Sequence, residues 1–206
     1  MKNLEIEYKW NGNSPRAFYK MRRALQCCAS VAAPEKVNIT DTYLDDEKES
    51  LSAQKIALRV RCENKKWEVT FKTKTEIKNG LAVRREETLP LKNVYTLPEA
   101  LAFLKRKKSW KGLSLSNLHP RFTIKNKRTV YDVHFQQSIA QASCDDFEIF
   151  VCGRTVKMKE IELELKKGTL EDLQLLAQRI VQQSGLKTVK NSKVKTAETL
   201  HKLWKA

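Results

Sequence analysis

Apolar and charged residues alternate along several segments of the chain. Between residues 4 and 10, an apolar side chain stands at every even position, whereas the odd positions carry Glu5, Glu7 and Lys9. A period of two residues is typical of a β-strand with one apolar and one polar face. Similar alternation predicts further strands over residues 38–43, 56–62, 66–73, 81–89, 123–135, 139–144 and 156–165.

Other segments show the three- to four-residue spacing of apolar side chains that is typical of an amphipathic helix. These segments are residues 15–28, 97–107, 170–184 and 195–204. Ser14 and Pro15 favour the start of the first helix, and Gly185 favours the end of the third. About eight strands with three or four helices predict a single α+β domain over residues 1–206, built around an antiparallel sheet or barrel.

The polar faces of these strands are ionic. Arg59 and Arg61 alternate with apolar residues in one strand, and Glu160, Glu162 and Glu164 do so in another. An antiparallel sheet with one solvated face is the simpler explanation. However, carboxylates two residues apart on one face repel each other unless cations neutralise them. The pattern therefore favours a barrel with a charged interior and helices packed on the outside, in which Lys and Arg bind an anion and carboxylates hold a metal ion.

The charge balance is strongly basic, with 40 Lys and Arg against 24 Asp and Glu and a net charge of +16. This balance leaves nucleic-acid binding open, although the chain shows no motif of the common nucleic-acid-binding modules. A hydrophobic fraction of 41% is too high for a disordered polycation. Neither a membrane span nor a secretory signal is predicted. Five cysteines without a Cys-x-x-Cys pair favour a reducing, cytoplasmic location.

Several charged motifs follow one another in order along the chain. They are Glu5-Ile6-Glu7-Tyr8-Lys9, Thr42-Tyr43-Leu44-Asp45, Ile56-Ala57-Leu58-Arg59-Val60-Arg61, Trp67-Glu68-Val69-Thr70-Phe71-Lys72, Arg84-Arg85-Glu86-Glu87, Lys159-Glu160-Ile161-Glu162-Leu163-Glu164-Leu165 and Asn191-Ser192-Lys193. Together they resemble the signature of the CYTH domain, the triphosphate tunnel metalloenzyme family. The resemblance spans about residues 3 to 200.

The resemblance implies an eight-stranded antiparallel β-barrel, or tunnel, whose charged interior binds a linear triphosphate. It gives the role of binding phosphate to Lys9, Arg59, Arg61, Lys72, Arg84, Arg128 and Lys193. It gives the role of binding Mg²⁺ or Mn²⁺ to Glu5, Glu7, Glu86, Asp145, Glu160, Glu162 and Glu164. Within these sets the expected catalytic residues are Glu5, Glu7, Lys9, Arg59 and Lys72. Oxygen ligands of this kind suit hard cations.

The activity that the resemblance implies is metal-dependent hydrolysis of inorganic triphosphate to pyrophosphate and phosphate. Members of the family also hydrolyse thiamine triphosphate or cyclise ATP to cyclic AMP. A thiamine or nucleoside triphosphatase, an adenylate cyclase of the class IV type, and a protein that only binds polyphosphate or nucleic acid are therefore alternatives. Three residues depart from the family pattern: Asn126 stands where lysine is common, Thr196 where arginine is common, and Asp46 where threonine is common.

Overall fold

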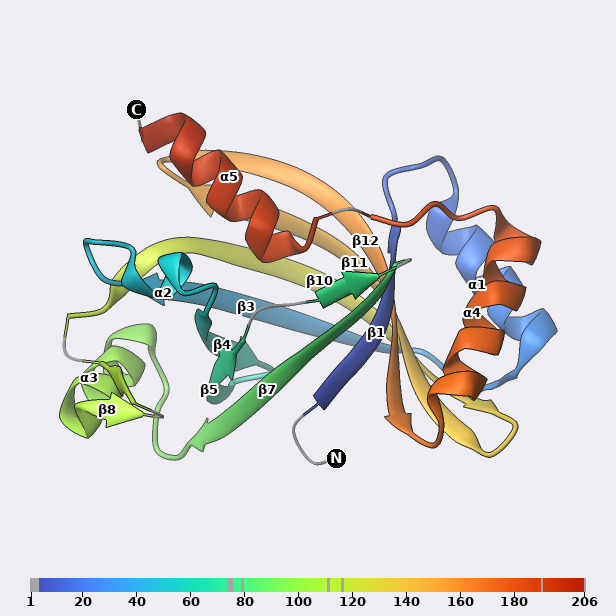
Figure 1. The fold of residues 1–206 in the computed structure, drawn as a ribbon, viewed down its shortest axis with the longest axis horizontal. Coiled ribbons are helices and arrows are strands. Elements are labelled where there is room, and N and C mark those ends of the chain that lie inside the picture. Colours follow the sequence, from blue (N-terminus) through green and yellow to red (C-terminus); the bar gives the residue numbers. More distant parts are fainter. Residues whose placement is uncertain are drawn as a thin grey trace.

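An antiparallel sheet closes on itself to form a barrel in the computed structural model, which describes residues 4–73, 76–78, 80–110, 112–115, 117–189 and 191–205 (Figure 1). Eight strands follow one another around the barrel in the order β1-β12-β11-β10-β3-β4-β5-β7, and β7 pairs back with β1. All of these pairings are antiparallel. The eight-stranded antiparallel barrel predicted from the sequence is therefore confirmed.

The barrel strands are β1 (Leu4–Asn11), β3 (Glu35–Asp45), β4 (Ala57–Glu63), β5 (Lys66–Lys72), β7 (Leu81–Leu91), β10 (His119–Phe135), β11 (Ser138–Val151) and β12 (Arg154–Lys167). Four short strands lie outside this closed path: β2 (Ser30–Val31), β6 (Glu76–Lys78), β8 (Ser109–Trp110) and β9 (Leu113–Ser114). The helices are α1 (Ala17–Cys28), α2 (Ser50–Ala53), α3 (Leu97–Lys107), α4 (Leu170–Ser184) and α5 (Lys193–Lys205).

The register between strands brings charged faces together that are far apart in the sequence. Lys9 of β1 lies opposite Glu162 of β12, and Glu5 of β1 lies opposite Arg84 of β7. Because side chains alternate across a strand, one such pair determines, for both strands, which residues face the interior and which face outward. The ionic faces of these strands consequently turn toward the interior of the barrel.

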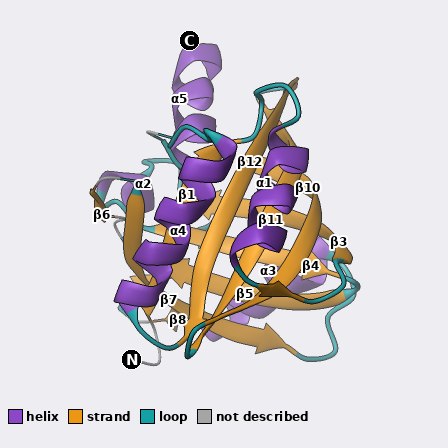
Figure 2. Cartoon of the chain, turned by 90° about the vertical axis from the view of Figure 1, so that its right-hand side faces the viewer, coloured by secondary structure: helices purple, strands orange, loops and turns teal. Residues whose placement is uncertain are grey.

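Helices α1 and α4 lie side by side against the outer surface of the barrel (Figure 2). Met21 and Leu25 of α1 and Leu176 of α4 share a buried apolar cluster with Trp10 and Leu163 of the sheet. Burying a Leu or Met side chain stabilises the fold by about 1.5–3 kcal/mol relative to exposure. The apolar faces of β1 and β12 are therefore covered, and their ionic faces remain for the interior.

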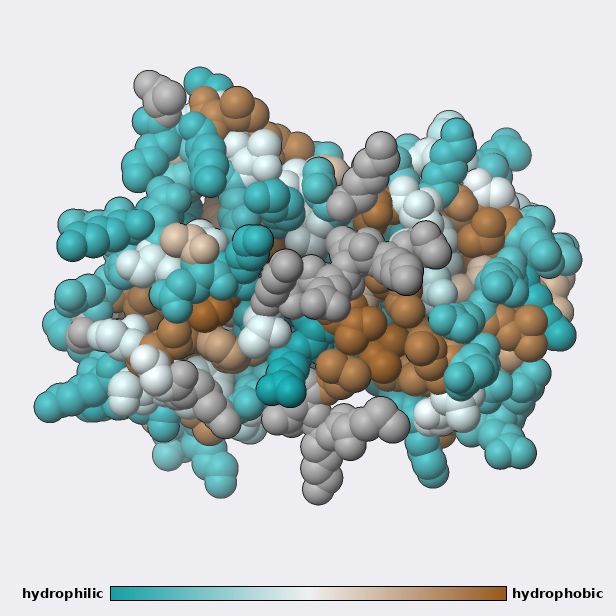
Figure 3. All heavy atoms as spheres, in the orientation of Figure 1, coloured by the Kyte–Doolittle hydropathy of each residue, from teal (hydrophilic) through white to brown (hydrophobic). Residues whose placement is uncertain are grey.

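Helix α3 covers another part of the outer surface, where Leu104 packs with Leu58, Val60 and Val69 of β4 and β5. The predicted packing of helices on the outside of the barrel is confirmed by α1, α3 and α4. Hydrophilic side chains project around most of the outline of the molecule (Figure 3). In the described parts of the chain, no helix combines the length and the apolar character that a membrane crossing requires.

Helix α5 occupies a different place, at one end of the barrel (Figure 1). Its Ala197 is fully buried in a cluster with Tyr43, Ile124 and Phe147. Tyr43 and Ile124 also line the interior cavity, so α5 packs against residues of the inner face. This packing fixes the start of α5, and with it Lys193, beside the interior.

The element boundaries differ from the sequence predictions in several places. Helix α1 begins at Ala17, because Ser14 and Pro15 form a turn and Arg16 takes a left-handed conformation with φ of 60° and no side-chain cap. The predicted end of α4 is confirmed, because Gly185 has φ of 65° and donates its N–H to the carbonyl of Val181 at 2.8 Å. Strands β10, β11 and β12 extend further than the alternation of their residues indicated.

Candidate active site

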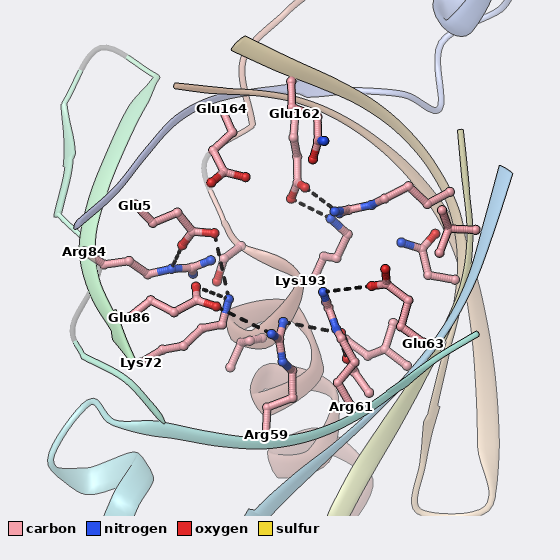
Figure 4. Close-up of a pocket in the computed structure, with 18 of the residues that line it drawn as sticks. Glu5, Arg59, Arg61, Glu63, Lys72, Arg84, Glu86, Glu162, Glu164 and Lys193 are labelled. Carbon is pink, nitrogen blue, oxygen red and sulfur yellow. Dashed lines mark hydrogen bonds and ion pairs between the residues drawn. The ribbon is translucent and has the colours of Figure 1, made fainter. Parts of the chain in front are cut away.

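The barrel encloses a cavity of about 480 Å³ with an ionic wall (Figure 4). All seven basic residues singled out in the sequence line this cavity; we refer to them as the tunnel cations: Lys9, Arg59, Arg61, Lys72, Arg84, Arg128 and Lys193. Among the acidic residues singled out, Glu5, Glu86, Glu162 and Glu164 line it too. The remaining three, Glu7, Asp145 and Glu160, contact the tunnel cations from the wall.

Strands β1, β5 and β7 form one side of the cavity. Arg84 donates a hydrogen bond to Glu5, and Lys72 Nζ lies 2.6 Å from Glu86 Oε2. Burial lowers the pKa of Lys72 to about 8, and the neighbouring Arg59 and Arg84 act in the same direction. Burial alone would raise the pKa of Glu5, but Lys72 and Arg84 hold it far below its usual range. Glu5 is therefore ionised at neutral pH.

Strands β10, β11 and β12 form the opposite side, together with the first residue of α5. Lys193 Nζ lies 2.8 Å from Asp145 Oδ2, 2.6 Å from Glu160 Oε1 and 2.7 Å from Glu162 Oε1. Arg128 donates two hydrogen bonds of 2.7 Å to Asp145 and one of 2.6 Å to Glu162. Burial opposes the ionisation of Glu162, but Lys193, Lys9 and Arg128 outweigh it and hold its pKa well below the usual range.

Lys9 connects the two sides of the tunnel. Its Nζ lies 2.6 Å from Glu162 Oε1 and 3.0 Å from Glu7 Oε1. Burial raises the pKa of Glu7, the carboxylates of Glu5 and Glu162 act in the same direction, and against the opposing effect of Lys9 and Arg84 the result is about 7. Glu7 therefore changes its protonation state near neutral pH.

Asp41 of β3 is a site residue that the sequence analysis missed. Its carboxylate accepts hydrogen bonds from Arg61 Nε at 2.7 Å and Arg61 Nη2 at 2.9 Å, and Arg59 Nη1 lies 3.6 Å away. Burial would raise the pKa of Asp41, but the two arginines hold it well below the usual range. The motif in this strand begins at Thr42, whereas Asp41 and Tyr43 are the residues that face the cavity. Alternation along β3 was the signal that could have found Asp41.

Glu164 is separated from the other predicted metal ligands. It lines the cavity, and its Oε2 lies 2.6 Å from Lys166 Nζ. Its side chain is 26% exposed, compared with 10% for Glu162 on the same strand. The structure therefore brings Asp145, Glu160 and Glu162 together but not Glu164.

Carboxylates outnumber the tunnel cations. Among the described residues, nine carboxylates lie within 3.8 Å of these seven cations; we refer to them as the tunnel carboxylates: Glu5, Glu7, Asp41, Glu63, Glu68, Glu86, Asp145, Glu160 and Glu162. With every group ionised, the two sets carry a net charge of −2, although the chain carries +16. The basic surplus of the protein therefore lies outside the tunnel.

The tunnel carboxylates have the right chemistry for a divalent cation, but their oxygens already contact lysines and arginines. In the described part of the chain, no three Asp, Glu, His or Cys side chains stand ready to hold a metal ion. However, Asp145, Glu160 and Glu162 converge within 2.8 Å of one ammonium group, that of Lys193. A donor set of carboxylate oxygens suits Mg²⁺ and Mn²⁺. The set fits such a cation once the ammonium group moves aside.

A second cavity, of about 850 Å³, adjoins the tunnel beside α2 and α5. Tyr43, Lys72 and Arg84 line both cavities. Tyr43 also stacks on Phe122, with ring centroids 4.8 Å apart and an angle of 22° between the rings. No pattern in the sequence predicts this cavity, because its wall comes from segments that meet only in the folded chain.

Comparison with known sequences gives two findings. The sequence model of the CYTH domain matches residues 3–197. An inorganic triphosphatase of Haemophilus influenzae is 35% identical over 133 residues, which cover 65% of this chain. The match covers 37% of that relative, so the chain spans little more than a third of its length.

Solved structures share the fold. A Hippeastrum protein described as having a dominant triphosphatase activity superposes with a TM-score of 0.69 at 17% identity, covering 95% of both chains. A protein of Pyrococcus horikoshii superposes with a TM-score of 0.65 at 17% identity, covering 95% of this chain and 99% of its own. The triphosphatase of the Mimivirus capping enzyme gives a TM-score of 0.53 at 15% identity, with coverage of 88% and 90%. At these identities the similarity shows a common fold.

Proposed function

This chain belongs to the CYTH domain family, and on that premise we propose that it hydrolyses inorganic triphosphate to pyrophosphate and phosphate inside the tunnel. The observation that carries this proposal is the convergence of seven basic side chains on one cavity of about 480 Å³. Such a concentration of cations in a concave, partly desolvated site is suited to a small, highly charged anion. The similarity to an inorganic triphosphatase supports the choice of substrate.

The tunnel cations are the groups that we expect to bind the phosphates. They approach the cavity from several directions: Arg59 and Arg61 from β4, Lys72 from β5, Arg84 from β7, Lys9 from β1, Arg128 from β10 and Lys193 from α5. A guanidinium presents a planar set of donors that matches phosphate oxygens, and an ammonium group acts as a compact charge. Together they can surround a linear chain of phosphates.

Metal dependence follows from the charge balance of the tunnel. The tunnel cations are already outnumbered by carboxylates, so a polyanion needs additional positive charge to enter. We propose Mg²⁺ or Mn²⁺ as this charge, held first by the convergent group of Asp145, Glu160 and Glu162. The other ligands expected from the sequence are Glu5, Glu7 and Glu86, on the opposite side of the tunnel, and the more distant Glu164. When bound, such a cation neutralises phosphate charge and polarises the phosphoryl group.

In the proposed reaction, a water oxygen forms a bond to a terminal phosphorus, and the bond from that phosphorus to the bridging oxygen breaks. Pyrophosphate leaves with the electron pair of the broken bond. A tunnel carboxylate accepts the proton of the attacking water. The tunnel cations stabilise the negative charge that develops on the leaving pyrophosphate. We expect Glu5, Glu7, Lys9, Arg59 and Lys72 to be the catalytic residues.

The direct test is phosphate release from tripolyphosphate, thiamine triphosphate and ATP, each with Mg²⁺, Mn²⁺ or EDTA. We expect metal-dependent hydrolysis with a strong preference for tripolyphosphate. Formation of cyclic AMP from ATP would show a cyclase instead. Absence of turnover with all three substrates would show that the tunnel only binds its ligand.

Hydrolysis of an organic triphosphate is the second candidate, and the second cavity favours it. The stacked pair of Tyr43 and Phe122 lies next to Lys72 and Arg84, which face the tunnel. A triphosphate in the tunnel could therefore extend an aromatic group into the adjoining space. If this candidate is right, Phe122→Ala raises KM for the organic triphosphate and leaves KM for tripolyphosphate unchanged.

Nucleic-acid binding is an alternative that the surface charge keeps open. Because the basic surplus lies outside the tunnel, attraction to a phosphate backbone would be a property of the outer surface. Salt-sensitive binding to RNA of random sequence, without hydrolysis of any triphosphate, would favour this alternative over the enzyme. We expect weak binding that disappears at physiological salt.

We also propose a cytoplasmic location for the protein. All five cysteines are free, and Cys27 and Cys152 are exposed. Exposed free thiols are typical of a reducing compartment. Fractionation of the native source would test this proposal, and recovery in a secreted fraction would contradict it.

A further inference from the structure

Helix α3 ends in four consecutive basic residues, which we call the α3 cations: Lys105, Arg106, Lys107 and Lys108. All four are exposed. Exposed lysines elsewhere have carboxylate partners, as Lys157 Nζ does at 3.1 Å from Glu148 Oε1. In the part of the chain that the structure describes, no Asp or Glu carboxylate pairs with any of the α3 cations. This end of α3 therefore carries a concentrated charge that the fold does not neutralise.

The helix itself accounts for little of this charge. The C-terminal end of a helix carries about half an elementary negative charge, so one nearby cation is enough to balance it. Consecutive helical residues point about 100° apart, so the α3 cations surround the end of the helix. Four like charges so close together repel one another. An anionic partner would relieve this repulsion, whereas the fold alone gains nothing from the additional cations.

An apolar pocket of about 210 Å³ borders the α3 cations. Six residues line this α3 pocket, and all but one of them are apolar: Leu101, Ala102, Leu104, Lys105, Leu115 and Leu118. Lys105 belongs to both groups, so the pocket and the charge are continuous. An apolar cavity of about 150 Å³ can hold a molecule of the size of benzene. The α3 pocket therefore has room for one apolar side chain.

The shape and the lining of the α3 pocket favour a protein as the partner. A membrane-binding surface inserts apolar side chains that protrude, whereas the apolar surface here is recessed. Pockets for small molecules usually enclose about 300–1,000 Å³, which is more than this pocket offers. Bases of single-stranded nucleic acids stack on aromatic rings, and none of the six lining residues is aromatic. A single aliphatic side chain of a larger molecule fits best.

We propose that the α3 pocket and the α3 cations together bind an acidic segment of a partner protein. One aliphatic side chain of that segment occupies the pocket, and carboxylates next to it pair with the α3 cations. The buried side chain supplies most of the affinity, and the charges supply orientation and speed of association. None of the six residues lines the tunnel or the second cavity, so the partner leaves both open.

The test uses a fluorescein-labelled peptide in which one leucine precedes four aspartates, and fluorescence anisotropy measures its binding to the full chain. A second peptide has glycine in place of the leucine. Ala102→Phe fills the pocket from an exposed position on its rim. A fourfold variant removes the charge: Lys105→Gln, Arg106→Gln, Lys107→Gln and Lys108→Gln. Circular dichroism checks that each variant is folded.

A second fourfold variant is the matched control, because it removes the same charge from another helix. It replaces exposed residues in and just before α1: Arg16→Gln, Lys20→Gln, Arg22→Gln and Arg23→Gln. Helix α1 lies at the opposite end of the molecule from α3 (Figure 1). General attraction to a basic protein would respond equally to both fourfold variants, whereas a site at α3 responds to one of them.

We expect the parent to bind the leucine peptide about 10–100-fold more tightly than the glycine peptide, the range for burying one aliphatic side chain. Ala102→Phe should abolish this difference. The fourfold α3 variant should bind both peptides about 5–50-fold more weakly, because each exposed ion pair contributes little. The fourfold α1 variant should bind as the parent does.

Equal affinity of the parent for the two peptides, or no binding of either, would overturn the inference. This comparison needs no variant, so it decides even if Ala102→Phe does not fold. Equal losses in the two fourfold variants would show general attraction instead of a site. Vesicles of phosphatidylcholine and phosphatidylglycerol, and oligouridylate, are the remaining probes. If one of these binds through the α3 cations more tightly than the leucine peptide does, the partner is a membrane or an RNA and the inference is wrong.

Discussion

Lys193 holds three buried carboxylates together, and its replacement by methionine tests how far the stability of the fold depends on the charge of Lys193. The Nζ atom lies 2.6–2.8 Å from oxygens of Asp145, Glu160 and Glu162, and the side chain is 14% exposed. Methionine keeps an unbranched stem of similar length and removes the positive charge. In Lys193→Met, Lys9 and Arg128 are the cations among the described residues that still contact these carboxylates.

The expected loss of stability can be worked out from these contacts. Removing one partner of a buried ion pair costs about 3–5 kcal/mol. We expect the lower end of this range, about 3 kcal/mol, because two cations still contact the carboxylates. In a chain of 206 residues, each kcal/mol shifts Tm by about 2–4 °C, which gives a fall of roughly 6–12 °C. Differential scanning calorimetry in buffer with EDTA measures this fall.

Added Mg²⁺ or Mn²⁺ should reverse much of this loss. A cation that binds the folded state stabilises it, and in Lys193→Met no ammonium group competes for the three carboxylates. We therefore expect a larger metal-induced rise in Tm than in the parent. Lys195→Met is the control, because Lys195 is exposed on the same helix. A variant that keeps the Tm of the parent in EDTA, or that gains less from metal than the parent does, would refute this reasoning.

Three further predictions concern catalysis, pH and salt. Arg59→Ala should lower kcat for tripolyphosphate by about 10²–10³-fold with an unchanged circular dichroism spectrum, whereas the exposed Arg85→Ala should keep full activity. The pKa of Asp41 is lowered from 3.8 in the folded protein, so its ionised carboxylate stabilises the fold above that pH and loses this effect as the pH falls through the folded-state pKa. The difference in Tm between Asp41→Asn and the parent should therefore be largest at neutral pH and shrink below about pH 4. A difference that stays constant with pH would contradict this. Finally, kcat/KM for tripolyphosphate should fall with rising salt while kcat stays constant, because the basic surface attracts the substrate over distances that salt screens. A kcat/KM that does not change with salt would show that the surface charge does not attract the substrate.

The sequence was sufficient to predict which side chains face the tunnel wherever the alternation is unbroken. A strict period of two places Glu5, Glu7 and Lys9 on one face of β1, and Glu160 and Glu162 on one face of β12. Because Lys9 pairs with Glu162, these two faces lie on the same side of the sheet. Asp41 was missed although it obeys the same rule. Asp41 lies just before the motif that begins at Thr42, so the resemblance did not include it, although it shares the inner face with Tyr43 of that motif.

Other features of the site depend on contacts that no local pattern contains. Lys9 and Glu162 are 153 residues apart, so their hydrogen bond depends on how the whole sheet closes. The position of Lys193 depends on the packing of Ala197 against the inner face of the barrel. The buried Oδ1 atom of Asn126 has no hydrogen-bond partner among the described residues, and only the folded arrangement reveals this.

The division of charge between the tunnel and the surface gives each a separate task. Of the 40 basic residues, seven are tunnel cations, and of the 24 acidic residues, nine are tunnel carboxylates, which leaves 33 basic and 15 acidic residues elsewhere in the chain. The long-range attraction for an anion therefore comes from the surface, with a surplus of +18. Inside, the cations are held in place by carboxylates and can bind a phosphate only if those carboxylates receive another positive partner. Under the proposed function a divalent cation would meet that need, so the surface charge would govern how fast the anion arrives and the metal would govern how tightly it binds inside the tunnel.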